Sequence, residues 1–152
     1  MSPPLASSVF SSMRSESPSR SREVLFVCAH GIVRSRVAAA FFNLVAPPGW
    51  WATSAGLEPE SQLGETARSL LAGTKASRFL ETGPPRSLED SPSSDVLVAI
   101  DCEVPGAEQW RLTTQEIGRA MAEELRTRSA TLAALLSEPA RDSGQVVRQL
   151  SG

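Results

Sequence analysis

Two short, continuous apolar runs constrain the fold of this chain more than any other feature of its sequence. Residues 24–28 read Val-Leu-Phe-Val-Cys, and residues 95–100 read Asp-Val-Leu-Val-Ala-Ile. A strand that is apolar at nearly every position is buried on both faces, which is typical of parallel sheets covered by helices. The two runs therefore predict inner strands of a parallel sheet.

Helical patterns alternate with these strands. Apolar residues recur at helical spacing after Ser35, the expected N-cap, until Pro47 and Pro48 end the helix. A second helix is expected over 65–72, and a third should begin at a capping box of Thr113 and Glu116 and end near Ser137. Residues 50–53 and 110–112 are further candidate strands. This alternation predicts an α/β fold with a parallel sheet and helices on both faces, in three layers.

Composition divides the chain into three parts. Residues 1–22 are mostly Ser, Pro and Arg and have too few large apolar groups to fold, so we expect this segment to be disordered. Residues 23–137 carry the periodic patterns and form one domain. Residues 138–152 are expected to be a mobile tail.

Charge and cysteine content exclude several classes of protein. The net charge of −2 and the pI of about 5.5 disfavour nucleic-acid binding, which requires a basic face. No apolar run approaches the ~20 residues of a membrane span. Two cysteines and one histidine are too few for a structural zinc site, and the cysteines are expected to be thiols of a cytoplasmic protein.

The segment from Cys28 to Ser35 carries the chemistry. It reads Cys-Ala-His-Gly-Ile-Val-Arg-Ser and joins a buried strand to a helix. Five residues between Cys28 and Arg34 allow the backbone to curl so that its N–H groups surround an anion, and the helix N-terminus adds its positive end. The same field favours a thiolate at Cys28. We therefore expect a loop that binds a tetrahedral oxyanion, phosphate or arsenate, with Cys28 as nucleophile.

Other side chains in this loop fit such a site. Arg34 offers a planar fork that matches two oxygens of phosphate. Ser35 can donate its hydroxyl to the sulfur, and Gly31 tolerates the positive φ of a sharply curled loop. The loop residues Ala29, His30, Gly31, Ile32 and Val33, together with Arg34, are expected to bind the substrate. The alternative is that Cys28 is a small core residue and Arg34 a solvated charge.

The stretch Val-Leu-Phe-Val-Cys-Ala-His-Gly-Ile-Val-Arg-Ser resembles the signature of the low-molecular-weight protein tyrosine phosphatase superfamily, which includes the thioredoxin-coupled arsenate reductases. Ser54-Ala55-Gly56 and Val98-Ala99-Ile100-Asp101 are similar to the family's second- and third-strand endings, so residues 23–137 are covered. The resemblance implies a sheet in the order 2-1-3-4. It also implies Cys28, Arg34 and Ser35 as catalytic residues, a phosphocysteine intermediate, and no metal or organic cofactor.

The sequence departs from the phosphatase pattern at one important position. Thr114 stands where these phosphatases carry the aspartate that protonates the leaving group. Threonine cannot do this near neutral pH, and general acid catalysis contributes about 10²–10⁴-fold. Glu103, Glu108 and Glu116 are candidate substitutes, or solvated surface charges. Gly31 also replaces the asparagine of the family loop.

Two residues resemble the reductases instead. His30 gives the loop a Cys-x-His opening, and Cys102 lies where reductases keep their first resolving cysteine, which makes it a possible redox partner of Cys28. The third cysteine of those enzymes has no counterpart, and Cys102 could be an inert thiol.

Three functions therefore remain open. They are a phosphomonoester hydrolase acting on phosphorylated protein, an arsenate reductase with thioredoxin as partner, and a binding module for oxyanions or phosphoproteins that lacks the general acid.

Overall fold

The computed structural model describes residues 22–59, 64–91 and 93–137. Disorder was expected for residues 1–22 and mobility for 138–152, and of these only Arg22 lies within the described range. Arg22 is the first residue of β1, two residues before the apolar run that predicted this strand, so the expected disorder was wrong for Arg22.

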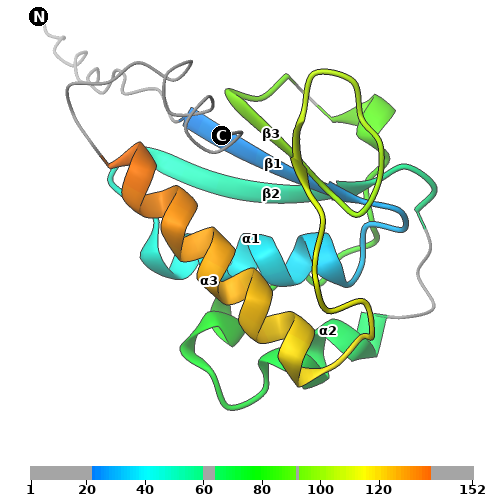
Figure 1. Cartoon of the computed structure of the whole chain (residues 1–152), viewed down its shortest axis with the longest axis vertical. Helices are drawn as coiled ribbons and strands as arrows, with labels where there is room; N and C mark the ends of the chain where they lie inside the picture. Colours follow the sequence, from blue (N-terminus) through cyan, green and yellow to red (C-terminus); the bar gives the residue numbers. More distant parts are fainter. Residues whose placement is uncertain (1–21, 60–63, 92, 138–152) are drawn as a thin grey trace, which may run out of the picture.

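The described residues form strands and helices that alternate along the chain (Figure 1). In chain order, these elements are β1 (Arg22–Cys28), α1 (Arg34–Val45), β2 (Trp50–Gly56), α2 (Gly64–Leu71), the 3₁₀ helices η2 (Lys75–Phe79) and η3 (Leu88–Asp90), β3 (Val96–Ile100), β4 (Glu108–Trp110) and α3 (Arg119–Leu136).

The four strands are parallel and lie in the order β2-β1-β3-β4, which confirms the predicted α/β fold and its strand order. Strand β1 is central, and its Val24 pairs with Ala52 of β2 and Val96 of β3. The carboxyl ends of parallel strands meet at one edge of the sheet. Cys28 at the end of β1 therefore lies beside Gly56 of β2, the residue with which it is paired.

The main core lies between the sheet and the three α-helices, which pack on the same face (Figure 1). Phe26 of β1 is at its centre, with ring centroids 6.2 Å from Phe42 of α1 and 5.5 Å from Trp110 of β4. Ser129 of α3 is fully buried and donates to the carbonyl of Ala38, which fixes α3 against α1. These contacts hold α1, and with it the loop that precedes α1, against the sheet.

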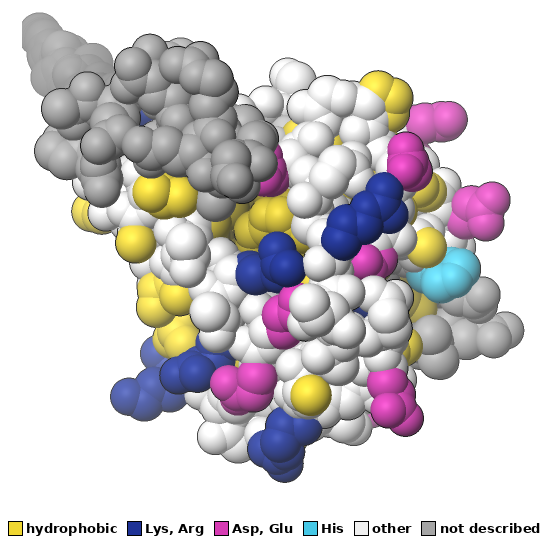
Figure 2. Space-filling model, viewed as in Figure 1, with side chains coloured by type: hydrophobic (Ala, Val, Ile, Leu, Met, Phe, Trp, Pro, Cys, Tyr) yellow, Lys and Arg dark blue, Asp and Glu magenta, His cyan; other side chains and the backbone are white. Residues whose placement is uncertain are grey.

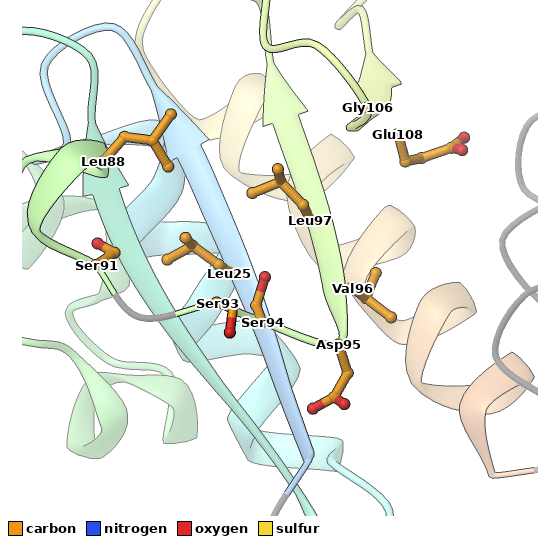
Figure 3. A pocket seen from close by; sticks show the side chains of 10 residues that line it. All are labelled: Leu25, Leu88, Ser91, Ser93, Ser94, Asp95, Val96, Leu97, Gly106 and Glu108. Atoms are coloured by element: carbon orange, nitrogen blue, oxygen red, sulfur yellow. The ribbon is translucent and has the colours of Figure 1, made fainter.

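The opposite face of the sheet has a thinner cover. Leu25, Val27 and Ala99 form a smaller cluster that Val104 and Leu88 of η3 cover. Residues 101–107, which join β3 to β4, are too few for the crossover helix usual between parallel strands. A cavity of about 420 Å³ remains on this face, with Leu25, Leu88 and Leu97 among its lining residues (Figure 3).

Two predicted helix starts were wrong. Helix α1 begins at Arg34, its N-cap Val33 makes no side-chain cap, and the Ser35 hydroxyl lies by the Cys28 sulfur instead. Helix α3 begins at Arg119, six residues after Thr113. Glu124 of α3 accepts from the backbone N–H groups of Thr113 and Thr114, which replaces the predicted capping box.

Close backbone contact between two glycines holds the loop after β1 against the end of β2. Gly31 has a φ of +74°, and a Cβ atom there would lie 2.7 Å from the nitrogen of Gly56. A Cβ atom on Gly56 would lie 2.5 Å from the carbonyl carbon of His30. Only glycines allow this approach. The Ser-Ala-Gly end of β2 therefore supports the loop through direct backbone contact.

We predict that Gly56→Ala destabilises the fold by about 1–3 kcal/mol, because the new methyl group overlaps backbone atoms that have no room to move. The matched control is Gly83→Ala, since a Cβ atom at Gly83 would meet nothing within 4 Å. Chemical denaturation of both variants tests this difference. Equal stabilities for the two would contradict the close contact.

The second prediction concerns Glu124, which anchors the segment after β4. Burial raises the pKa of this carboxyl, but hydrogen bonds from Thr113, Thr114 and Arg128 outweigh it and lower the pKa to about 2. A carboxyl with a lowered pKa stabilises the fold above its ordinary value of 4.5, and the stabilisation is lost as pH falls toward 2. The stability difference between wild type and Glu124→Gln should therefore shrink from pH 6 to pH 2. A constant difference would exclude this electrostatic role.

Candidate active site

The sulfur of Cys28 is buried at the base of the loop between β1 and α1. Two backbone N–H groups donate to it, those of Gly31 and Ser35 at 3.3 and 3.4 Å, and its thiol donates to the Ser35 hydroxyl oxygen at 3.2 Å. Once the sulfur has lost its proton, the same hydroxyl can donate to it. Ser35 itself is fully buried. A sulfur that accepts several hydrogen bonds is stabilised as a thiolate, which is the nucleophilic form of cysteine. The structure thus brings Cys28, Gly31 and Ser35 together around one atom.

Arg34 opens helix α1 and extends toward the segment after β4. Its Nη2 donates to the backbone carbonyl of Gln115 at 2.9 Å, and its Nε lies 3.5 Å from the Asp101 carboxylate. This Nε is buried and has no hydrogen-bond partner among the described residues. Arg34 therefore has one buried N–H that lies beside the Asp101 carboxylate without a hydrogen bond.

Asp101 links three parts of the site. It is the first residue after β3 and has a φ of +53°, the only non-glycine positive φ in the described part of the chain. Its carboxylate accepts from the Leu112 backbone N–H and the Gln115 side chain, besides facing Arg34. Strained backbone of this kind is often found at functional sites. Asp101 fixes the guanidinium of Arg34 relative to the loop that follows β4.

A cavity of about 40 Å³ lies over Cys28. Its walls are the loop residues Ala29, His30, Ile32, Val33 and Arg34, together with Ile117. Ile117 comes from the segment before α3 and leaves an apolar side chain about 40% exposed beside the loop. The cavity is small, as a site for an oxyanion would be, and Ile117 adds an apolar side chain to its wall.

His30 is exposed at the rim of the same cavity. Its Nδ1 lies 3.2 Å from the backbone carbonyl of Glu58. A carbonyl only accepts hydrogen bonds, so Nδ1 carries the proton and donates it. His30 therefore lies in the loop as the sequence predicted, and its hydrogen bond to Glu58 orients the imidazole ring.

Arg36 connects the first turn of α1 to the segment that follows η2. It is buried, and it donates to the backbone carbonyls of Glu81 and Gly83. Burial lowers the pKa of its guanidinium, and the nearby Glu81 carboxylate, which raises this pKa, offsets the effect only in part. These hydrogen bonds tie the start of α1 to the segment after η2.

Cys102 lies close to Cys28, and both are free thiols. The Cys102 sulfur donates to the carbonyl of Val27, the residue before Cys28, at 3.5 Å. Burial raises the pKa of the Cys102 thiol, and the neighbouring Cys28 and Asp101 raise it further. A thiol with a raised pKa is a poor nucleophile near neutral pH.

The structure separates the candidate substitutes for the missing acid. Glu103 pairs with Arg111 on the surface, and Glu108 lines the 420 Å³ cavity, which shares no residue with the cavity over Cys28. Glu116 is exposed beside Ile117 but does not line the cavity. Thr114 lies in the segment that Glu124 anchors. Apart from Cys28 and Arg34, His30 is the only titratable residue that lines this cavity in the described part of the chain.

Sequence reasoning missed three residues of the site. Asp101 could have been found, because it directly follows β3 at the functional edge of the sheet. Gln115 acts through its backbone carbonyl, for which a sequence carries no signal. Ile117 falls within the helix expected from Thr113 to Ser137, but it precedes α3 and lines the cavity.

The wider surface offers few signs of other ligands. Within residues 22–59, 64–91 and 93–137, no group of three or more His, Cys, Asp or Glu side chains is arranged to hold a metal ion. No helix in these ranges is long and apolar enough to cross a membrane. On the face shown in Figure 2, basic and acidic side chains are interspersed.

Comparison with known proteins agrees with this geometry. An arsenate reductase from Archaeoglobus fulgidus is 30% identical, with a TM-score of 0.59 over 73% of this chain and 98% of its own. The thioredoxin-dependent arsenate reductase of Corynebacterium glutamicum is 26% identical, with a TM-score of 0.59 over 75% of this chain and 61% of its own. The YwlE arginine phosphatase of Geobacillus stearothermophilus shares the fold at 18% identity, with a TM-score of 0.55 over 80% and 99% of the two chains.

A search of curated protein sequences gave no match. The family profile described as low molecular weight phosphotyrosine protein phosphatase matches residues 23–130, which is most of the chain and includes the whole loop from Cys28 to Ser35. With the sheet order and the cysteine loop in agreement, the chain belongs to this family.

Proposed function

We propose that the chain is a cysteine-dependent phosphomonoester hydrolase that acts through a phosphocysteine intermediate, with aryl phosphates such as phosphotyrosine as its substrate class. The observation that carries this proposal is the Cys28 sulfur, held by the N–H groups of Gly31 and Ser35 and the Ser35 hydroxyl at the start of α1. Membership of a phosphatase and arsenate reductase family supports it.

In the first step, the Cys28 thiolate attacks phosphorus, an S–P bond forms, and the P–O bond to the alcohol or phenol breaks. The loop N–H groups and Arg34 stabilise the charge on the three equatorial oxygens. Ser35 stabilises the thiolate through its hydrogen bond. In the second step, water attacks phosphorus and breaks the S–P bond, which releases phosphate and restores the thiolate.

Ile117 favours a phosphate ester over a free oxyanion as the substrate. Its exposed side chain borders the cavity over Cys28, where it would contact an apolar group attached to the phosphate. Free arsenate has no such group and gains nothing from an apolar wall.

Arsenate reduction is the second candidate function. It is favoured by the similarity of this chain to two arsenate reductases, at 30% and 26% identity, and by the short path from Cys28 to Cys102. Two features oppose it: the raised pKa of Cys102 and the absence of a third cysteine from the sequence. In this alternative, thioredoxin would supply the electrons. The third possibility is a binding module for oxyanions or phosphoproteins, in which the loss of the family's acid at Thr114 has ended turnover.

The first test of the proposed function is Cys28→Ser. This variant should lose all turnover of dinitrophenyl phosphate, because a serine hydroxyl is not ionised here, and it should still bind inorganic phosphate through the N–H groups of the loop. Steady-state kinetics and calorimetric titration with phosphate measure the two properties. Turnover equal to that of wild type would show that Cys28 is not the nucleophile. Binding without any wild-type turnover would favour the binding module.

Cys102→Ser separates the phosphatase from the reductase. Serine keeps a hydroxyl that can donate to the Val27 carbonyl, so we expect aryl phosphate hydrolysis within about twofold of wild type. Arsenate reduction in the presence of thioredoxin should be absent from both proteins. Reduction by wild type that disappears in Cys102→Ser would establish the reductase alternative.

A further inference from the structure

The phosphatase chemistry described above leaves one proton without a donor. When the P–O bond breaks, a phenolate or alkoxide leaves, and it must be protonated unless it is already very stable. Thr114 has no ionisable proton near neutral pH. Glu103 is held by Arg111, and Glu108 lines a separate cavity. The leaving oxygen therefore needs a donor from the walls of the cavity over Cys28.

His30 is in position to be that donor. It lines this cavity together with Cys28 and Arg34, and it is exposed at the rim. The phosphate ester is attached to its leaving group on the side away from Cys28, which is the open side of the loop. A side chain at the rim is therefore nearer to the leaving oxygen than one at the base.

The hydrogen bond to Glu58 fixes which ring nitrogen is available. Nδ1 donates to the backbone carbonyl of Glu58, so the exchangeable proton is on Nε2. No described residue makes a hydrogen bond to Nε2. The contact with Glu58 thus orients the ring in the way that a carboxylate or carbonyl orients catalytic histidines in general.

We propose that His30 is the general acid and base of this enzyme, an inference that rests on the proposed phosphatase function. In the first step, the imidazolium gives its Nε2 proton to the leaving oxygen as the P–O bond breaks. In the second step, the neutral Nε2 takes a proton from water as its oxygen attacks phosphorus and the S–P bond breaks. One proton leaves Nε2 and one returns, so the cycle is balanced.

The charged groups around His30 are compatible with this cycle. Cys28 and Arg34 line the same cavity, Asp101 faces Arg34, and Glu58 contributes the carbonyl that holds Nδ1. The charges of Arg34 and Asp101 offset each other. The Cys28 thiolate and a bound phosphate ester therefore make the site negative overall. An imidazole nitrogen can both give and take a proton, which suits both proton transfers.

The test is the dependence of the rate on the leaving group in His30→Asn. Asparagine places an N–H where Nδ1 was, so it keeps the hydrogen bond to Glu58 but cannot transfer a proton. We expect a near-wild-type kcat/KM for dinitrophenyl phosphate, whose leaving group needs no acid, and a loss of about 10²–10⁴-fold in kcat/KM for phenyl phosphate. The kcat should fall for both esters, because hydrolysis of the phosphocysteine also loses its base. The fall of kcat/KM for phenyl phosphate at high pH should disappear in the variant. In His30→Ala, added imidazole should restore part of the lost rate.

The outcomes separate this inference from the function on which it rests. Wild type without Cys28-dependent turnover of dinitrophenyl phosphate would overturn both. Cys28-dependent turnover with the same loss of kcat/KM for both esters in His30→Asn would show that His30 only shapes the loop, and would overturn this inference alone. No loss of kcat/KM for either ester would do the same, and Glu116→Gln would then be measured on phenyl phosphate as the competing acid.

Discussion

The backbone contact between Gly31 and Gly56 is the constraint on which the site depends. It requires β1 and β2 to end side by side, and it places the loop against β2 with no side chain between them. The two residues that follow β2 extend this contact, because the N–H groups of Leu57 and Glu58 donate to the carbonyls of Cys28 and Ala29. The outward carbonyls of the loop are thereby satisfied, which leaves its N–H groups free to face the sulfur and an anion.

The other side of the site depends on charge rather than on close packing. Asp101 adopts a left-handed conformation that aims its carboxylate at Arg34, and Leu112 and Gln115 complete its hydrogen bonds. Arg34 is thereby joined to the segment after β4, which also contributes Ile117. Because Glu124 anchors this segment from α3, the orientation of Arg34 depends on three elements that are distant in the sequence.

The sequence predicts the parts of this protein that depend on burial and periodicity. The apolar runs at 24–28 and 96–100 identify β1 and β3, and the spacing from Cys28 to Arg34 identifies the loop, because each is determined by local residues. Long-range competition explains the errors. Ser35 could cap a helix, but the buried sulfur of Cys28 is a nearer partner for its hydroxyl. Thr113 precedes Glu116 at capping-box spacing, but a carboxylate from α3 binds it first.

The position of His30 suggests that the oxyanion cradle and the proton donor are separable parts of this fold. The cradle needs the backbone of residues 28–35, the N-terminus of α1 and one arginine, all fixed by the contacts with β2 and Asp101. The donor needs only to reach the open side of the bound phosphate. The loop and the segment after β4 both line the cavity over Cys28, through His30 and Ile117. Thr114 gives the segment after β4 no proton to donate near neutral pH, and His30, whose Nδ1 is held by the Glu58 carbonyl, is the donor that we propose from the loop.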